Sequence, residues 1–156
     1  MPRKGPSARR RVEPDTLFGS QLVTRFVNKL LKAGKKTRAE EIMYGALQHI
    51  QEQSGQNPLE VLRNAVRNTM PSLEVKPRRV GGATYQVPVE TSPERQLSLA
   101  LRWIVDLANN RKGVAFERAL AQEIRDAAAG QGNAVKKRDE THRMAQANRA
   151  FAHLRW

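Results

Sequence analysis

The sequence predicts a mainly α-helical fold of about six helices, with a protruding two-stranded β-hairpin and a flexible basic N-terminal arm. Three observations predict this fold: apolar residues recur at helical spacing through most of the chain, one stretch alternates with period two, and the first residues combine proline and arginine with few apolar side chains. A chain of 156 residues can bury a core as one domain. We therefore expect residues 1–14 to form the arm and residues 15–156 a single helical domain.

The arm has too few apolar side chains to offset the entropy that it would lose on ordering. It is either a solvated tail or an arm that binds anions, and its concentration of cations favours the second interpretation. These cations are Arg3, Lys4, Arg9, Arg10 and Arg11.

The first three helices have recognisable ends. One helix with an apolar stripe follows Ser20 and stops at Gly34, and a second runs to about Ser54. The third has the clearest start, because Asn57 can cap it and Pro58 suits the first helical position.

Three more helices follow the hairpin. Thr91 or Ser92 caps the fourth, which is the most apolar and is expected at the centre of the core; the fifth covers about 114–129 and the mostly polar sixth about 134–149. The apolar tail that follows either docks back or contacts a partner. Several carboxylates fall where helix surfaces are expected, and we predict that they are solvated. They are Glu40, Glu41, Glu117, Glu123 and Asp126.

The hairpin is expected at about 72–90, where Leu73, Val75, Tyr85, Val87 and Val89 alternate with polar residues. Two prolines interrupt these strands, which a two-stranded ribbon tolerates because each strand has an unpaired edge. Gly81 and Gly82 can adopt positive φ at the tip. We expect Tyr85 to pack the hairpin against the fourth helix rather than to stack on a base.

The charge points to an anionic partner. The chain has 28 Lys and Arg against 15 Asp and Glu, a net charge of +13, which a polyanion would offset. Nucleic acid is the leading candidate and an anionic membrane surface the second. Four basic clusters carry the signal: the arm; Lys32, Lys35, Lys36 and Arg38; Lys76, Arg78 and Arg79 in the hairpin; and Lys136, Lys137 and Arg138. The last cluster falls in the expected first turn of the sixth helix, where the helix dipole disfavours cations. Either an external anion lies nearby or the helix boundary is misplaced.

Signals of catalysis are weak. The chain has no cysteine, its three histidines are scattered, and we find no phosphate-binding glycine loop and no nucleophile with a base. We expect no enzymatic activity, no metal and no cofactor. No apolar run is long enough to span a bilayer and no secretory signal is evident, so we expect a cytoplasmic protein without membrane contact. The composition predicts a partner no more specific than nucleic acid. An enzyme that acts on RNA and a DNA-architectural protein are therefore alternatives to a structural RNA-binding protein.

A resemblance to a known family favours one of these classes of nucleic-acid-binding protein. The stretches FVNKLLKAGKK, RRVGGATYQVPVE, SLALRW and GNAVKKRDETHRMAQANRAFAHLRW resemble the bacterial family of small-subunit ribosomal protein seven, over nearly the whole chain. The resemblance implies a structural protein of the ribosome that binds the 3′ major domain of small-subunit ribosomal RNA and nucleates assembly of the subunit head. It also implies a position near the exit-site transfer RNA and the messenger RNA path, with neighbouring small-subunit ribosomal proteins as partners.

The resemblance also implies which residues contact RNA. They come from the arm, the first interhelical turn, the hairpin, the fourth helix and the end of the chain. Beyond the five arm cations, these residues are Lys35, Lys36, Lys76, Arg78, Arg79, Gly81, Gly82, Arg95, Arg102, Lys136, Lys137 and Arg143. Residues 15–156 are accordingly expected to act as one RNA-binding domain.

Overall fold

The computed structural model describes residues 11–154, so four cations of the predicted arm, Arg3, Lys4, Arg9 and Arg10, lie outside the described residues. The chain divides into two compact units, Met1–Met43 and Tyr44–Trp156. The part of the chain that the structure describes is mostly helical with one two-stranded antiparallel sheet, which confirms the predicted fold class. The expectation of a single domain over residues 15–156 stays a prediction.

The first unit contains α1 (Gln21–Leu30) and the start of α2 (Lys36–Ser54). The predicted apolar stripe of α1 is its buried face, formed by Val23, Phe26, Val27 and Leu30. The helix ends at Leu30, four residues before the predicted stop at Gly34, and the turn that follows uses positive φ at Ala33 (51°) and Gly34 (74°).

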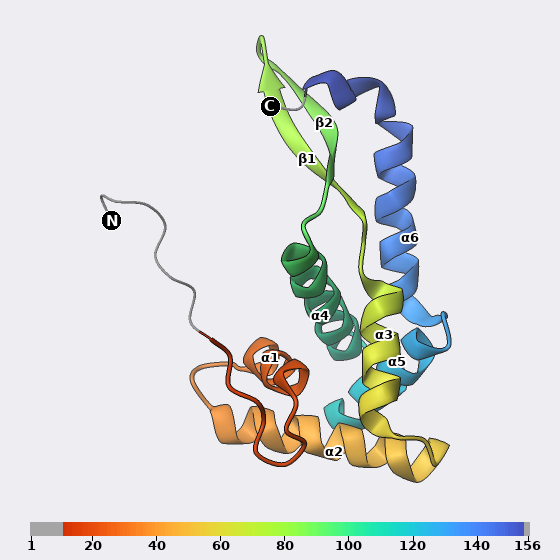
Figure 1. The fold of residues 1–156 in the computed structure, drawn as a ribbon. Coiled ribbons are helices and arrows are strands. Elements are labelled where there is room, and N and C mark those ends of the chain that lie inside the picture. The colour runs from red at the N-terminus through yellow and green to blue at the C-terminus, as the bar shows by residue number, and fades with distance from the viewer. Residues whose placement is uncertain (1–10, 155–156) are drawn as a thin grey trace, which may run out of the picture. The chain divides into compact units, whose positions relative to one another are not determined.

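The second unit is built around α3 (Pro58–Thr69), α4 (Pro93–Asn109) and α5 (Phe116–Ala128), with α6 (Gly132–Ala147) packed against α4 and α5 (Figure 1). The cap predicted for α3 is present, because Asn57 Oδ1 accepts the N–H of Leu59 at 3.0 Å. Side chains from all three central helices are fully buried. They include Leu62, Leu101, Ile104, Leu120 and Ile124.

The hairpin consists of β1 (Leu73–Val80) and β2 (Ala83–Glu90), paired antiparallel with Arg78 opposite Tyr85. Gly81 and Gly82 have φ of 57° and 90°, which a two-residue turn of this hand requires. The predicted strands and the glycine turn at the tip are therefore confirmed.

One side of the hairpin is covered, although it extends beyond α4 (Figure 1). The chain ends in a short 3₁₀ helix, η1 (Arg149–Leu154), which packs against β2, while α6 packs against β1. The ring of Tyr85 lies 5.2 Å from that of Phe151, at an interplanar angle of 50°. The tail thus docks back on its own chain, and the expected packing of Tyr85 on α4 is wrong, because η1 supplies its ring partner.

The start of α6 resolves the open question about Lys136, Lys137 and Arg138. The helix begins at Gly132, two residues before the expected start, so these cations lie beyond its first turn and the conflict with the helix dipole disappears. The misplaced boundary is the correct explanation.

Glu123 corrects the prediction that it lies on a solvated helix face. Its side chain is fully buried, and its Oε2 accepts hydrogen bonds from Arg111 Nε at 3.1 Å and Nη2 at 2.6 Å. Its other oxygen accepts the backbone N–H of Ala134 at 2.9 Å, so this carboxylate caps the first turn of α6. A side chain at Gly132 would come within 3.3 Å of the same oxygen, which ties the glycine to the close approach of the two helices.

Candidate nucleic-acid interface

The hairpin carries three of the predicted contact cations on β1, and β-strand alternation divides them between two faces. Lys76 and Arg78 share the face of Val87 and Tyr85, their partners on β2, while Arg79 lies on the opposite face beside Thr84. Lys76 and Arg79 are exposed and Arg78 is half-buried. The strand therefore presents positive charge on both sides.

The tip of the hairpin is open. Gly81 and Gly82 are exposed, and a Cβ built on either would meet nothing within 4 Å. Positive φ, not crowding within the protein, is what restricts these positions to glycine. The same lack of side chains lets another molecule approach the backbone closely.

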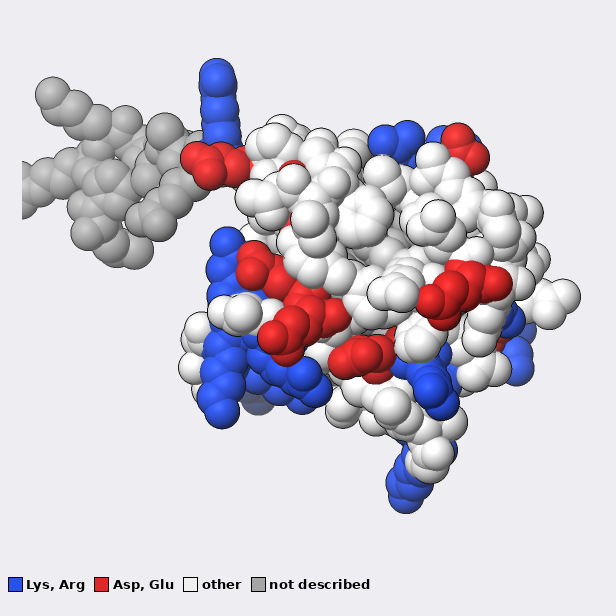
Figure 2. Space-filling view, turned by 90° about the horizontal axis from the view of Figure 1, so that it is seen from below, with Lys and Arg blue, Asp and Glu red and all other residues white. Residues whose placement is uncertain are grey.

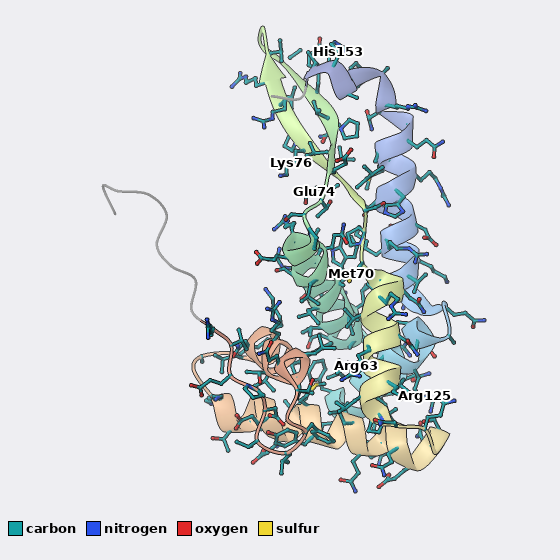
Figure 3. All side chains as sticks on the ribbon, in the orientation of Figure 1. Arg63, Met70, Glu74, Lys76, Arg125 and His153 are labelled. Carbon is teal, nitrogen blue, oxygen red and sulfur yellow. The ribbon has the colours of Figure 1, made fainter. Side chains whose placement is uncertain are left out.

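An acidic residue joins the hairpin to α4. Glu74 lies on the same strand face as Lys76, and its Oε1 is 2.9 Å from Lys76 Nζ. Its Oε2 accepts a hydrogen bond from Arg95 Nε, in the first turn of α4, at 3.2 Å. Figure 3 shows Glu74 and Lys76 on the stretch of β1 closest to that end of α4. Two predicted contact residues, separated by 19 positions in the sequence, are thus brought together by one carboxylate.

The ion pairs change the acidity of Glu74. Burial, the largest influence, would raise the pKa of this carboxyl, but the hydrogen bonds and charges of Lys76 and Arg95 together lower the pKa below its ordinary value. Glu74 therefore stays ionised, and its side chain is only 11% exposed against 49% for Lys76 and 46% for Arg95. The two cations remain accessible while their shared anion is largely covered.

Arg102 extends this basic surface along α4. It lies two helical turns from Arg95, so both arginines occupy the face opposite the buried residues Ile104 and Ala108, and both are exposed. We call Lys76, Arg95 and Arg102, with Glu74 beneath them, the β1–α4 surface.

The predicted residues on α6 lie on its outer face. Lys136 and Arg143 are exposed, seven residues apart, and face away from the buried stripe that includes Ala134 and Ala145. Lys137 is also exposed and lies 3.8 Å from Glu140. These three cations form a basic area of the same unit on the outer face of α6.

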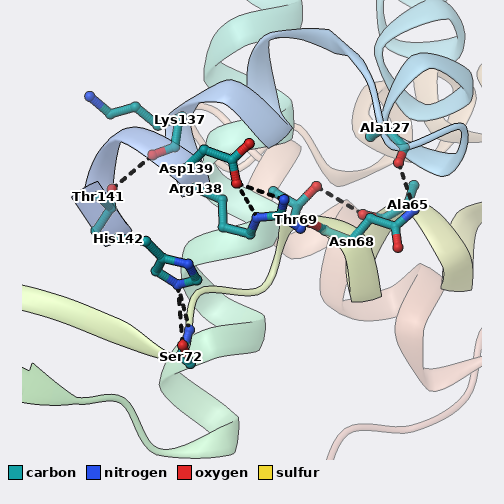
Figure 4. Close-up of polar contacts among 10 residues, drawn as sticks. All are labelled: Ala65, Asn68, Thr69, Ser72, Ala127, Lys137, Arg138, Asp139, Thr141 and His142. Atoms are coloured by element: carbon teal, nitrogen blue, oxygen red, sulfur yellow. Dashed lines mark hydrogen bonds and ion pairs between the residues drawn. The ribbon is translucent and has the colours of Figure 1, made fainter. Parts of the chain in front are cut away.

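Polar contacts fix α6 against α3 and the start of β1 (Figure 4). Arg138 donates to the backbone carbonyl of Asn68 and pairs with Asp139, while the side-chain amide of Asn68 donates to the carbonyls of Ala127 and Ala128 at 3.0 Å. His142 Nε2 accepts the backbone N–H of Ser72 at 3.0 Å. Arg138 therefore serves the fold, unlike its neighbours Lys136 and Lys137.

The first unit presents its own cations. Lys35 and Lys36 are exposed at the start of α2, with Lys36 Nζ 3.5 Å from Glu40, and Arg11 is exposed before α1. Arg38 pairs with Glu41 at 2.9 Å. On the face of the molecule shown in Figure 2, the largest group of Lys and Arg side chains lies beside Asp and Glu side chains, and further cations lie around its edge. Such partly paired surface charges remain available to a polyanion because exposed ion pairs are weak.

Residues 11–154 offer neither a metal site nor a membrane span. Among these residues, no three His, Asp or Glu side chains come together as metal ligands. Nor does any helix in this range combine the length and apolar character that crossing a membrane requires.

Comparison with known proteins decides the family. The profile of the family described as ribosomal protein S7p/S5e matches residues 2–149 of the chain. The chain belongs to this family. The family is one of structural ribosomal proteins, so the expectation of a non-enzymatic protein of the cytoplasmic ribosome is confirmed, and so is the stated resemblance.

Full-length relatives agree with this assignment. The chain is 58% identical to a protein of Carboxydothermus hydrogenoformans, 57% to one of Dictyoglomus thermophilum and 56% to one of Thermomicrobium roseum, in each case over the whole of both chains. Each of these relatives is named small ribosomal subunit protein uS7.

Two residues that the sequence pattern did not single out have clear roles in the structure. Glu74 joins two basic contact candidates of an RNA-binding protein, and strand alternation with Lys76 was the one local signal for it. Arg111 is a cation turned inward: burial lowers its pKa, but Asp126 and Glu123 raise the pKa above its ordinary value, so it stays charged within the fold.

Proposed function

We propose that the protein is a structural constituent of the small ribosomal subunit. In this proposal it binds the 3′ major domain of small-subunit ribosomal RNA directly and nucleates assembly of the subunit head. The relatives' shared name and the full-length identity support the assignment to the small subunit. The observation that carries direct RNA binding is the β1–α4 surface, where two exposed cations are held together over a largely covered carboxylate.

The chemistry of this surface suits a structured RNA. Lys and Arg neutralise phosphates and release counterions, which gives affinity without reading sequence. RNA helices hide most base edges in a narrow groove, so shape, phosphate and 2′-hydroxyl contacts dominate their recognition. A hairpin with cations on both faces can enter between RNA helices and meet phosphates on two sides.

The proposed contact residues are those that the resemblance implied. The contacts would be shared among the arm, the α1–α2 turn, the β1–α4 surface with the hairpin tip, and the outer face of α6. They are Arg3, Lys4, Arg9, Arg10, Arg11, Lys35, Lys36, Lys76, Arg78, Arg79, Gly81, Gly82, Arg95, Arg102, Lys136, Lys137 and Arg143. We propose that residues 15–156 act in this as one RNA-binding domain, with neighbouring ribosomal proteins as further partners.

A binding experiment tests the RNA partner. The full chain is immobilised, total cellular nucleic acid is offered at near-physiological salt, and the retained molecules are sequenced. Small-subunit ribosomal RNA should be enriched, with the 3′ major domain protected from nuclease. Enrichment of genomic DNA, or equal retention of all RNA, would sink the proposal.

The proposal also places the hairpin tip near the exit-site transfer RNA and the messenger RNA path. The chain has no cysteine, so Ala83→Cys gives a single attachment point at the exposed tip for a photo-crosslinker. In assembled subunits carrying transfer RNA, this probe should crosslink to transfer RNA or messenger RNA. Val114→Cys, exposed beyond the opposite end of the 17-residue α4, is the matched control and should not. Equal crosslinking from both positions would contradict the placement.

A further inference from the structure

The β1–α4 surface contains a carboxylate where a binder of polyanions gains nothing from negative charge. Glu74 is covered by its partners, with 11% of its side chain exposed. A fixed anion close to a phosphate raises the energy of binding through like-charge repulsion. Its presence at the centre of the basic surface therefore needs a reason other than the charge itself.

The geometry of the two ion pairs supplies that reason. Arg95 contacts Glu74 through Nε, at 3.2 Å. This leaves Nη1 and Nη2, the planar fork that matches the two oxygens of a phosphate, at the far end of a side chain that is 46% exposed. Lys76 likewise gives one of its ammonium donors to Glu74 at 2.9 Å and keeps two others. The carboxylate occupies the inner donors of both cations and leaves the outer ones.

The two ion pairs with Glu74 also restrict the side-chain conformations of Lys76 and Arg95 before RNA binds. Less conformational entropy is then lost on binding. Lys and Arg side chains are long, and ordering each one at an interface has an entropic cost. Here one buried anion holds Lys76 of β1 by its ammonium group and Arg95, in the first turn of α4, by its Nε. The pair is ordered before any ligand arrives.

We propose that Glu74 is a positioning residue, which holds Lys76 and Arg95 as a preformed two-cation clamp for one backbone phosphate of a structured RNA. The inference rests on the proposed function, since it assumes that this surface binds RNA. It goes further by assigning an acidic residue a favourable role in binding an anion.

Glu74→Gln separates positioning from bulk charge because the two predict opposite signs. If Glu74 acts only through its charge, removing it strengthens RNA binding slightly. If Glu74 positions the clamp, the neutral amide loses at least one of the two cations, and the Kd for a 3′ major domain RNA fragment rises about 2- to 10-fold, the cost of ordering a long side chain. The slope of log Kd against log salt also falls by roughly 0.7–0.9, as expected when one phosphate is no longer neutralised.

Asp106→Asn is the matched control. Asp106 is exposed on the same face of α4 as Arg95 and Arg102, eleven residues along from Arg95, so this change removes one negative charge from that face without touching the clamp. It should leave RNA affinity unchanged or slightly raise it. Circular dichroism and thermal melting of both variants show whether the helical fold is retained.

A second variant tests the clamp even if Glu74→Gln loosens the hairpin. Arg95→Lys keeps the charge but removes the fork, so RNA affinity should fall while the melting temperature is retained. In a Lys76→Ala, Arg95→Ala background, adding Glu74→Gln should cause no further loss, because there is nothing left to position.

The outcomes distinguish this inference from the proposed function. Unchanged or tighter binding by Glu74→Gln with an intact fold overturns the positioning role, as does wild-type affinity in Arg95→Lys. If the wild-type chain itself shows no preference for the RNA fragment, the proposed function fails instead.

Discussion

Replacing Glu123 with alanine should destabilise the second unit more than any other single carboxylate change in it. Glu123 is fully buried and accepts hydrogen bonds from Arg111 and from the backbone of Ala134. Breaking a buried ion pair by removing one partner costs about 3–5 kcal/mol. In this variant Arg111 still has Asp126 as an ion-pair partner at 2.7 Å, and its side chain is 21% exposed. The cost of losing the ion pair with Glu123 therefore lies at the lower end of that range. The orphaned N–H of Ala134 adds about 1–3 kcal/mol.

The expected loss in the free energy of unfolding is therefore about 4–6 kcal/mol, or a fall in melting temperature of roughly 10–20 °C for a chain of this size. Urea and thermal denaturation followed by circular dichroism measure it. Asp126→Ala is the matched control: Asp126 shares Arg111 but is one-third exposed, so its loss should cost about 1 kcal/mol.

A double-mutant cycle sharpens the test. Arg111→Ala alone leaves a buried carboxylate without its cation, whereas the Arg111→Ala, Glu123→Ala pair removes both charges, so the pair should cost less than the two single changes added together. Strict additivity, or a loss below about 1 kcal/mol for Glu123→Ala, would refute the reasoning that this carboxylate organises the start of α6.

Three further changes address the hairpin and its base. Substituting Lys76, Arg78 and Arg79 with alanine should leave helical circular dichroism intact but weaken RNA binding and flatten its salt dependence by roughly 0.7–0.9 for each phosphate that is no longer neutralised; loss of helicity would show that the ribbon belongs to the core. Gly82→Ala, at φ of 90°, should destabilise the hairpin by about 1–3 kcal/mol, read from faster amide exchange in β1 and β2; unchanged exchange would argue against the turn. Because the folded-state pKa of Glu74 is depressed, its stabilisation is complete above the ordinary carboxyl pKa of about 4.3 and is lost as the pH falls through the lower folded value. Acid titration of Glu74→Gln should show a smaller loss of stability in that window than wild type.

The elements that the sequence predicts best are those set by local chemistry. Asn57 and Pro58 mark the start of α3 because a cap and a fixed φ act within one turn. Gly81 and Gly82 mark the hairpin turn because its backbone conformation nearly requires them. For such features, the residues involved are neighbours in the chain.

The errors arise where a partner is distant in sequence. The sequence places the start of α6 two residues late because the N–H of Ala134 is satisfied by Glu123, a carboxylate from α5. Gly130, with φ of 74°, ends α5, so Gly132 is free to open the next helix. The sequence predicts a solvated Glu123 because nothing in its own helix indicates Arg111, which approaches from the preceding loop.

The candidate site divides in the same way. The local sequence identifies the cluster of cations on β1, and strand alternation places Lys76 and Arg78 on one face. The bridge from Glu74 to Arg95 depends on how the hairpin leaves α3 and enters α4, which is a property of the packed unit. The docking of Phe151 on Tyr85 depends likewise on the reversal of the chain after α6.

That docking has a consequence for the order in which the protein is made. The hairpin can pair through its own short turn as soon as Glu90 has been synthesised, but its covering strip, η1, consists of residues 149–154 near the end of the chain. During synthesis, residues 91–148 are added after β2 and before η1. The side of β2 that η1 contacts is therefore uncovered until the last of these residues has been added. A two-stranded ribbon is only marginally stable by itself, so the hairpin reaches its full stability only once residues 149–154 have packed against it.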